Sequence, residues 1–134
     1  MRRSLFAVAL LSPLIVGCQK GDGGVKVSGR ILRDGQPLPK AQVVFQSVGS
    51  DGMPDPNKDA GGETDENGKY SLKRSQSKDD GVIPGDYRVE IHSLERSATG
   101  IRELVPSQYN KASTIKFTVP PGGTSEAHFD LKTK

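Results

Sequence analysis

Two short runs of alternating apolar residues, between residues 25 and 45, constrain the fold of this chain more than any other feature. Residues of one parity in these runs are apolar, and they are Val25, Val27, Ile31, Ala41, Val43 and Phe45. An alternation with period two that is rich in β-branched residues is typical of half-buried strands. Between the runs, Asp34-Gly35 can adopt positive φ at low cost and favours a tight turn. The segment predicts two short strands, at about residues 25–32 and 41–48.

A second strand–turn–strand unit follows at residues 62–72. The turn reads Asp65-Glu66-Asn67-Gly68 and predicts a short hairpin in which Gly68 has positive φ. The neighbouring carboxylates of Asp65 and Glu66 could also be read as an acid–base pair. Such pairs need environments that push their two pKa values apart, and an exposed turn supplies none. We therefore interpret these residues as turn residues.

Three further runs at residues 87–92, 114–119 and 125–131 alternate in the same way. Together these runs predict an all-β fold, an antiparallel β-sandwich of about seven short strands. Residues 25–134 are expected to form this single domain. The predicted core combines apolar residues of one parity from several strands, namely Val43, Phe45, Val89, Ile91, Phe117 and Phe129.

The first 17 residues predict a signal peptide instead of a part of the domain. Arg2 and Arg3 precede an apolar run over residues 5–16. This run is shorter than the roughly 20 apolar residues that a bilayer-spanning helix needs, and it fits the apolar region of a secretory signal.

Without the two arginines the chain has 17 Lys and Arg against 16 Asp and Glu. A nearly neutral surface indicates no nucleic-acid partner.

The apolar run ends in Leu14-Ile15-Val16-Gly17-Cys18, which resembles the lipobox of bacterial lipoproteins. That resemblance implies cleavage before Cys18, a diacylglyceryl group on its thiol and an acyl chain such as palmitate on its amine. Cys18 is the only cysteine, so it has no partner for an internal disulfide. We predict that Cys18 is the lipid attachment site, that residues 18–24 are a flexible tether, and that the protein is exported. It would be anchored to a membrane of the bacterial cell envelope, on the periplasmic or the surface face.

Two longer connections carry their own hypotheses. The loop at residues 48–61 contains Asp51, Asp55, Asn57 and Asp59, which suggest calcium. It lacks the central Gly and terminal Glu of an EF-hand, so a solvated loop and no metal site are expected.

The connection at residues 94–112 is too apolar for a free loop. We expect it to cover one end of the sandwich, with a helical turn near residues 102–104; the alternative is a contact patch for a partner.

With these elements placed, the chain resembles the carboxypeptidase regulatory-like, transthyretin-like domains of small bacterial lipoproteins. The motifs that carry the resemblance are Val27-x-Gly29-x-Ile31, Asp34-Gly35-x-Pro37-Leu38-x-x-Ala41-x-Val43-x-Phe45, Thr64-Asp65-x-x-Gly68-x-Tyr70-x-Leu72 and Pro84-Gly85-x-Tyr87-x-Val89. The resemblance implies a seven-stranded Greek-key sandwich, transthyretin-like or immunoglobulin-like, without catalytic activity. Some relatives bind sugars, and one branch hydrolyses a purine-derived ring.

The sequence offers no catalytic or cofactor-binding residues. His92 and His128 have the outward parity of their strands, where exposed histidines are ordinary. The ring-hydrolase branch ends in Tyr-Arg-Gly-Ser, whereas this chain ends in Asp130-Leu131-Lys132-Thr133-Lys134. An enzyme of that transthyretin-related type is therefore the least favoured alternative.

A carbohydrate-binding module is the closer alternative, because relatives of this kind stack sugars on exposed aromatic rings. All the aromatic residues of the predicted strands have inward parity, which leaves only Tyr109 as a platform. We therefore expect a non-catalytic module without a cofactor, attached to the membrane through Cys18. Its role is expected to be structural or protein-binding, with an envelope protein as partner.

Overall fold

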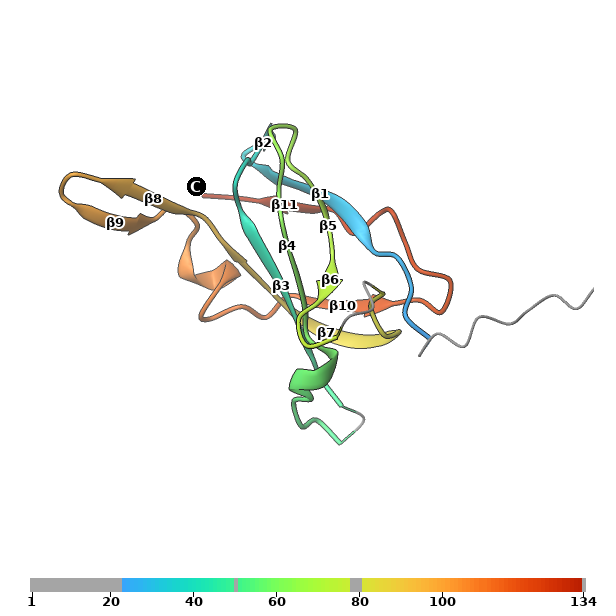
Figure 1. Cartoon of the computed structure of the whole chain (residues 1–134). Coiled ribbons are helices and arrows are strands. Elements are labelled where there is room, and N and C mark those ends of the chain that lie inside the picture. The colour runs from blue at the N-terminus through green and yellow to red at the C-terminus, as the bar shows by residue number, and fades with distance from the viewer. Residues whose placement is uncertain (1–22, 50, 78–80, 134) are drawn as a thin grey trace, which may run out of the picture.

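The computed structural model describes residues 23–49, 51–77 and 81–133 and confirms the all-β prediction. Two sheets face each other, and a separate two-stranded hairpin projects from them (Figure 1). The strands are β1 (Ser28–Arg33), β2 (Gln36–Pro37), β3 (Gln42–Ser47), β4 (Ala60–Glu63), β5 (Lys69–Ser71), β6 (Lys73–Arg74), β7 (Gly85–His92), β8 (Leu94–Ser97), β9 (Gly100–Glu103), β10 (Lys116–Val119) and β11 (Phe129–Leu131). The predicted signal peptide and the predicted lipid attachment site, Cys18, lie outside the described residues.

The larger sheet has the strand order β10-β7-β3-β4-β6, and all its neighbours are antiparallel. β7 and β3 form its centre, where Phe45 is paired with Val89 and Val43 with Ile91. Along both strands buried residues alternate with half-buried or exposed ones. This is the pattern that the alternation in the sequence predicted, and it confirms the inward parity of these residues.

The smaller sheet is built around β1. β11 lies parallel to β1 on one side, and β2 and β5 share the other side, both antiparallel to it. The parallel β1–β11 pair departs from the purely antiparallel sandwich that was expected. β1 and β2 form the predicted tight turn, because Asp34 and Gly35 have φ values of 50° and 83°. Positive φ at both central residues is the mark of a type I′ hairpin.

The core lies between the two sheets. Phe45 of β3 is fully buried, and its ring lies 5.7 Å from Tyr87, 5.6 Å from Phe117 and 6.4 Å from Phe129 between centroids. Val43, Val89 and Ile91 are also fully buried, as predicted. Phe117 and Phe129 belong to the same cluster but remain partly exposed at its edge. The aromatic cluster therefore joins β3, β7 and β10 of one sheet to β11 of the other.

The turn at residues 65–68 is present, but the hairpin predicted around it is not. Gly68 has a φ of 75° and its N–H donates to the carbonyl of Asp65 at 3.0 Å. β4 before the turn pairs with β3 and β6, whereas β5 after it pairs with β1. The buried Thr64 hydroxyl accepts from the Ala41 N–H and donates to the Leu38 carbonyl, which holds the end of β4 in the larger sheet. The turn thus carries the chain from one sheet to the other.

The loop expected at residues 48–61 is shorter than predicted, because β4 already begins at Ala60. It contains a 3-10 helix, η1 (Pro56–Lys58), whose N-cap is Asp55. The carboxylate of Asp59 accepts from the backbone N–H of Ser47 at 2.8 Å, so this side chain ties the loop to β3.

The prediction for residues 94–112 is wrong in its first half. Residues 94–103 do not cover the sandwich but form the β8–β9 hairpin, hereafter the arm, which points away from it (Figure 1). The helical turn is η2 (Ser107–Tyr109) and not residues 102–104. The second half does pack, since Val105 and Asn110 are buried. Because the arm and the short strands β2 and β6 were not foreseen, the strands outnumber the predicted seven.

Candidate functional site

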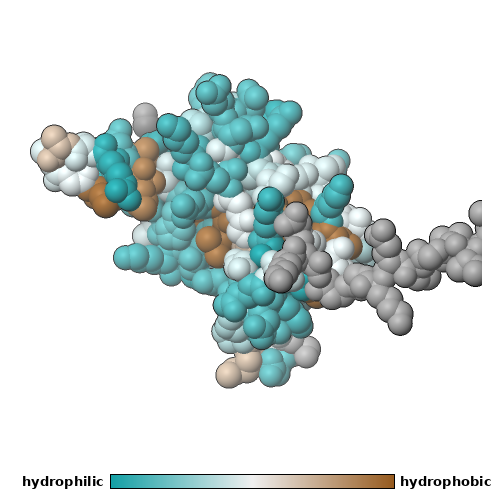
Figure 2. All heavy atoms as spheres, in the orientation of Figure 1, coloured by the Kyte–Doolittle hydropathy of each residue, from teal (hydrophilic) through white to brown (hydrophobic). Residues whose placement is uncertain are grey.

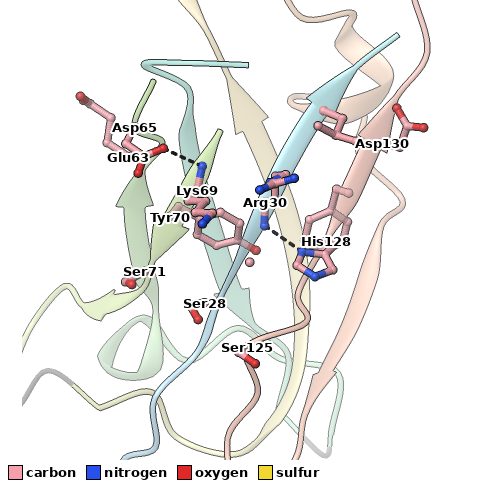
Figure 3. A pocket seen from close by; sticks show the side chains of 13 residues that line it. Ser28, Arg30, Glu63, Asp65, Lys69, Tyr70, Ser71, Ser125, His128 and Asp130 are labelled. Atoms are coloured by element: carbon pink, nitrogen blue, oxygen red, sulfur yellow. Dashed lines mark hydrogen bonds between the residues drawn. The ribbon is translucent and has the colours of Figure 1, made fainter. Parts of the chain in front are cut away.

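A groove lies on the outer face of the smaller sheet, across β5, β1 and β11 (Figure 3). Its volume is about 840 Å³. The residues that line it are mostly polar, and they are Ser28, Gly29, Arg30, Leu32, Glu63, Asp65, Lys69, Tyr70, Ser71, Ser125, His128, Phe129 and Asp130. Most apolar residues of these strands face the core, and the outward polar residues, together with Leu32 and the edge of Phe129, determine the chemistry of the groove.

Three nitrogen-bearing side chains form one row across the groove. Arg30 on β1 is the paired residue of Lys69 on β5, so both side chains project from the same face. On the other side of Arg30, its backbone N–H donates to Nδ1 of His128 at 3.0 Å. Figure 3 shows the three side chains side by side. In neutral His128 the remaining proton is then on Nε2, which makes this nitrogen a donor.

Three hydroxyl groups form a second row beside the first. Ser28 of β1 pairs with Ser71 of β5. This pair lies two residues along each strand from the Arg30–Lys69 pair and therefore on the same face of the sheet. Ser125 follows Thr124, which forms a parallel bridge with Val27, and it lines the same part of the groove (Figure 3). The groove thus presents nitrogen donors in one row and hydroxyl groups in the next.

Three carboxylates lie at the rim of the groove. Asp65 accepts from the backbone N–H groups of Asn67 at 2.8 Å and Lys69 at 3.0 Å, and Asp130 forms an ion pair with Lys132 at 2.9 Å. Within the described part of the chain, Glu63 has neither a hydrogen bond nor an ion pair through its side chain. Glu63 is therefore the one rim carboxylate whose side chain has no hydrogen-bond or ion-pair partner among the described residues.

Tyr70 closes the floor of the groove. Its ring is buried and its hydroxyl donates to the carbonyl of Ala127 at 2.6 Å. Burial raises the pKa of the Tyr70 phenol far above its ordinary value of 10.0. This hydroxyl therefore stays protonated and serves to connect β5 with the segment that leads into β11.

The structure does not bring the two histidines together. His128 lines the groove, whereas His92 lies on β7 in the larger sheet. The His92 ring lies between two carboxylates, with Nδ1 3.2 Å from Glu103 Oε2 and Nε2 3.3 Å from Glu90 Oε2. Glu103 Oε1 also accepts from the N–H groups of Ser93 and Val105. His92 thus belongs to the polar contacts that hold the base of the arm.

The carboxylates that suggested a calcium site accept hydrogen bonds from nearby backbone N–H groups instead. Asp51 accepts from the backbone N–H of Met53, Asp55 accepts from that of Asn57, and Asp59 binds β3. Among the residues that the structure describes, no three His, Cys, Asp or Glu side chains gather where they could hold a metal ion.

The arm is a second exposed surface. All of β8 is exposed, and β9 is exposed except at Glu103. Leu94 and Ile101 retain 57% and 62% of their accessible surface. They lie on the same face of the arm, because Ile101 pairs with Arg96, which is two residues after Leu94 on β8. Figure 2 shows atoms of hydrophobic residues, in brown, on the projecting arm at the left of the view. On the opposite face Arg102 forms an ion pair with Glu95 at 3.1 Å.

Tyr109, the one aromatic residue that the sequence left as a sugar platform, is occupied elsewhere. It is half-buried, its hydroxyl donates to the carbonyl of Lys132 at 3.1 Å and accepts from the N–H of that residue at 2.9 Å. No aromatic side chain in residues 23–49, 51–77 or 81–133 is exposed. Tyr109 therefore fastens η2 to the end of the smaller sheet.

No protein-family model matches the chain, and no curated protein is significantly similar to it. No helix in the described ranges is long and apolar enough to cross a membrane. The groove was not predictable from the sequence. Its residues were visible only as outward positions of separate strands, and no local signal indicates that β5 and β11 lie on either side of β1.

Proposed function

We propose that this chain is a lipid-anchored, non-catalytic module of the bacterial cell envelope that binds a protein partner through the β8–β9 arm. The anchor would be the lipidated Cys18 at the end of the lipobox-like sequence, followed by the glycine-rich tether. The strand and turn motifs resemble carboxypeptidase regulatory-like, transthyretin-like domains, and the all-β sandwich is compatible with that family.

The observation that carries this proposal is the exposure of the arm. A two-stranded hairpin is only marginally stable in water by itself, because it buries little apolar surface. Within the described residues β8 and β9 pair only with each other, so both outer edges present backbone groups that a further strand could use. Leu94 and Ile101 add an apolar face to these edges. The partner that fits is an extended strand with apolar side chains on one face, which would add to the arm.

The hydrogen-bond pattern leaves the backbone groups of Ile101, on the outer edge of β9, open to this contact. The N–H of Leu104 donates to the carbonyl of Ser93, and hydrogen-bonded pairs alternate with non-hydrogen-bonded ones along an antiparallel ladder. The Arg96–Ile101 pair is therefore non-hydrogen-bonded, and the backbone groups of Ile101 point to the outer edge. A partner strand can bond there while it covers the Ile101 side chain.

The carbohydrate alternative receives less support. Sugar-binding sandwiches use exposed rings, and the aromatic residues described here are buried or half-buried. A catalytic role is also not favoured, because His92 and His128 lie on different sheets and each has a local partner.

Photocrosslinking in intact envelopes tests the proposal. A photoreactive residue is placed at Ile101 on the arm, and a matched control is placed at the exposed Lys116 on β10. We expect a discrete protein adduct from position 101 only, which disappears when Leu94 is replaced by Ser in the same chain. Identical adducts from both positions, or none at 101 together with saturable binding to glycans, would refute arm-mediated protein binding.

A further inference from the structure

We propose that the groove across β5, β1 and β11 binds a small ligand that carries an oxyanion next to hydroxyl groups, as a phosphorylated sugar does. This site is separate from the arm and does not depend on the protein partner. The groove volume of about 840 Å³ lies within the range of about 300–1,000 Å³ that is usual for small-molecule sites.

The pairing of Arg30 with Lys69 is the first argument. Like charges directly opposite each other on neighbouring strands repel and destabilise a sheet. Neither side chain forms an ion pair with any described residue. An oxyanion between them would remove this repulsion, and the planar guanidinium of Arg30 can donate two parallel hydrogen bonds to a phosphate or a carboxylate.

His128 extends the row of donors on the other side of Arg30. Its Nδ1 already accepts the Arg30 N–H, so the neutral ring can only donate to a ligand, through Nε2. All three side chains of this row therefore offer N–H groups and no acceptor. This complements an oxyanion, which accepts hydrogen bonds and cannot donate them when fully ionised.

The serine row defines the rest of the ligand. Ser28 lies two residues before Arg30 on β1, which corresponds to about 6.6 Å along a strand. Ser71 and Ser125 flank it (Figure 3). A hydroxyl group both donates and accepts, and so it suits the hydroxyl groups of a sugar. A hexose with a phosphate at one end has the length to reach both rows.

The carboxylates at the rim provide a test of the sign of the ligand charge. Asp65 and Asp130 are already engaged by backbone N–H groups and by Lys132. Glu63 keeps an uncompensated negative charge on the groove. Removal of this charge should strengthen the binding of an anion, and it should weaken the binding of a cation.

Isothermal titration calorimetry of the full chain at low ionic strength tests the inference with glucose 6-phosphate, glucose and inorganic phosphate as probes. We expect glucose 6-phosphate to bind more tightly than either of the others. The double variant Arg30→Gln, Lys69→Gln should lose at least about tenfold in affinity, since two charge-assisted contacts are removed. Glu63→Gln should gain affinity, and the matched cation control Lys116→Gln should behave as wild type.

A gain of affinity in Glu63→Gln cannot arise from a loss of folding, so this variant tests the sign of the ligand charge independently of the stability of the double variant. The inference is overturned if glucose 6-phosphate gives no heat at millimolar concentration, if Glu63→Gln weakens binding, or if Lys116→Gln is as weak as the double variant. Equal affinity for inorganic phosphate would overturn the role of the serine row. Stronger binding to phosphatidylglycerol vesicles than to glucose 6-phosphate would assign the groove to a membrane surface instead and overturn it as a sugar-phosphate site.

Discussion

Replacement of Gly68 by alanine tests the turn that carries the chain between the two sheets. Gly68 has a φ of 75°, and a Cβ atom there would lie 2.5 Å from the Ile31 carbonyl oxygen and 3.2 Å from the Leu38 nitrogen. Gly35 has nearly the same φ, 83°, but nothing lies within 4 Å of its Cβ position. The two glycines therefore separate the cost of the backbone conformation from the cost of the contact.

The expected magnitudes follow from these two environments. A side chain at positive φ costs about 1–2 kcal/mol of folding free energy at either position. At Gly68 the blocked Cβ also disturbs two backbone hydrogen bonds, from Ile31 N–H to the Gly68 carbonyl at 2.8 Å and from Leu38 N–H to the Ile31 carbonyl at 3.0 Å. Each contributes about 1 kcal/mol. Gly68→Ala should therefore cost about 3–4 kcal/mol in total, and Gly35→Ala about 1–2 kcal/mol.

Urea unfolding followed by far-ultraviolet circular dichroism measures both losses. Asparagine tolerates positive φ better than alanine, so Gly35→Asn should be almost neutral, whereas Gly68→Asn should remain costly because its Cβ meets the same oxygen. Equal free energies of unfolding for Gly35→Ala and Gly68→Ala would refute the close approach of this turn to β1.

Three further predictions concern the core, the tyrosines and the anchor. Phe45→Ala should reduce the free energy of unfolding by about 3–5 kcal/mol, and Phe117→Ala by less, because Phe45 is fully buried and Phe117 is not; equal losses in urea titrations would contradict this. Burial raises the pKa of Tyr87 to about 12 and also raises the pKa of Tyr70. Above pH 10 the unfolded chain therefore loses these phenol protons before the folded chain does, and the free energy of unfolding should fall as pH rises. A urea midpoint that stays constant between pH 10 and 12 would disprove that linkage. Intact-mass measurement of membrane-extracted protein should show cleavage after Gly17 and added acyl mass on Cys18, and membrane localisation should be lost in Cys18→Ala; unchanged localisation would rule out the anchor.

The residue pattern alone predicts the parts of the fold that depend on neighbouring residues in the chain. The alternation around Phe45 and Val89 indicated which side chains face the core, because a strand turns successive side chains to opposite faces whatever its partner. Asp34-Gly35 and Gly68 indicated turns, because positive φ is a property of the residue in its own backbone. The class of the fold and most of its buried residues follow from such local rules.

Which strands are neighbours becomes visible in the folded chain alone. The turn at Gly68 looks the same in sequence whether its strands pair with each other or, as here, with two different sheets. The arm was missed for the same reason. The apolar Ile101 suggested burial, but the exposure of a hairpin depends on what packs against it. The groove needs Lys69 of β5, Arg30 of β1 and His128, which directly precedes β11, in one row. Strand pairing is a contact between distant residues, and local periodicity carries no information about it.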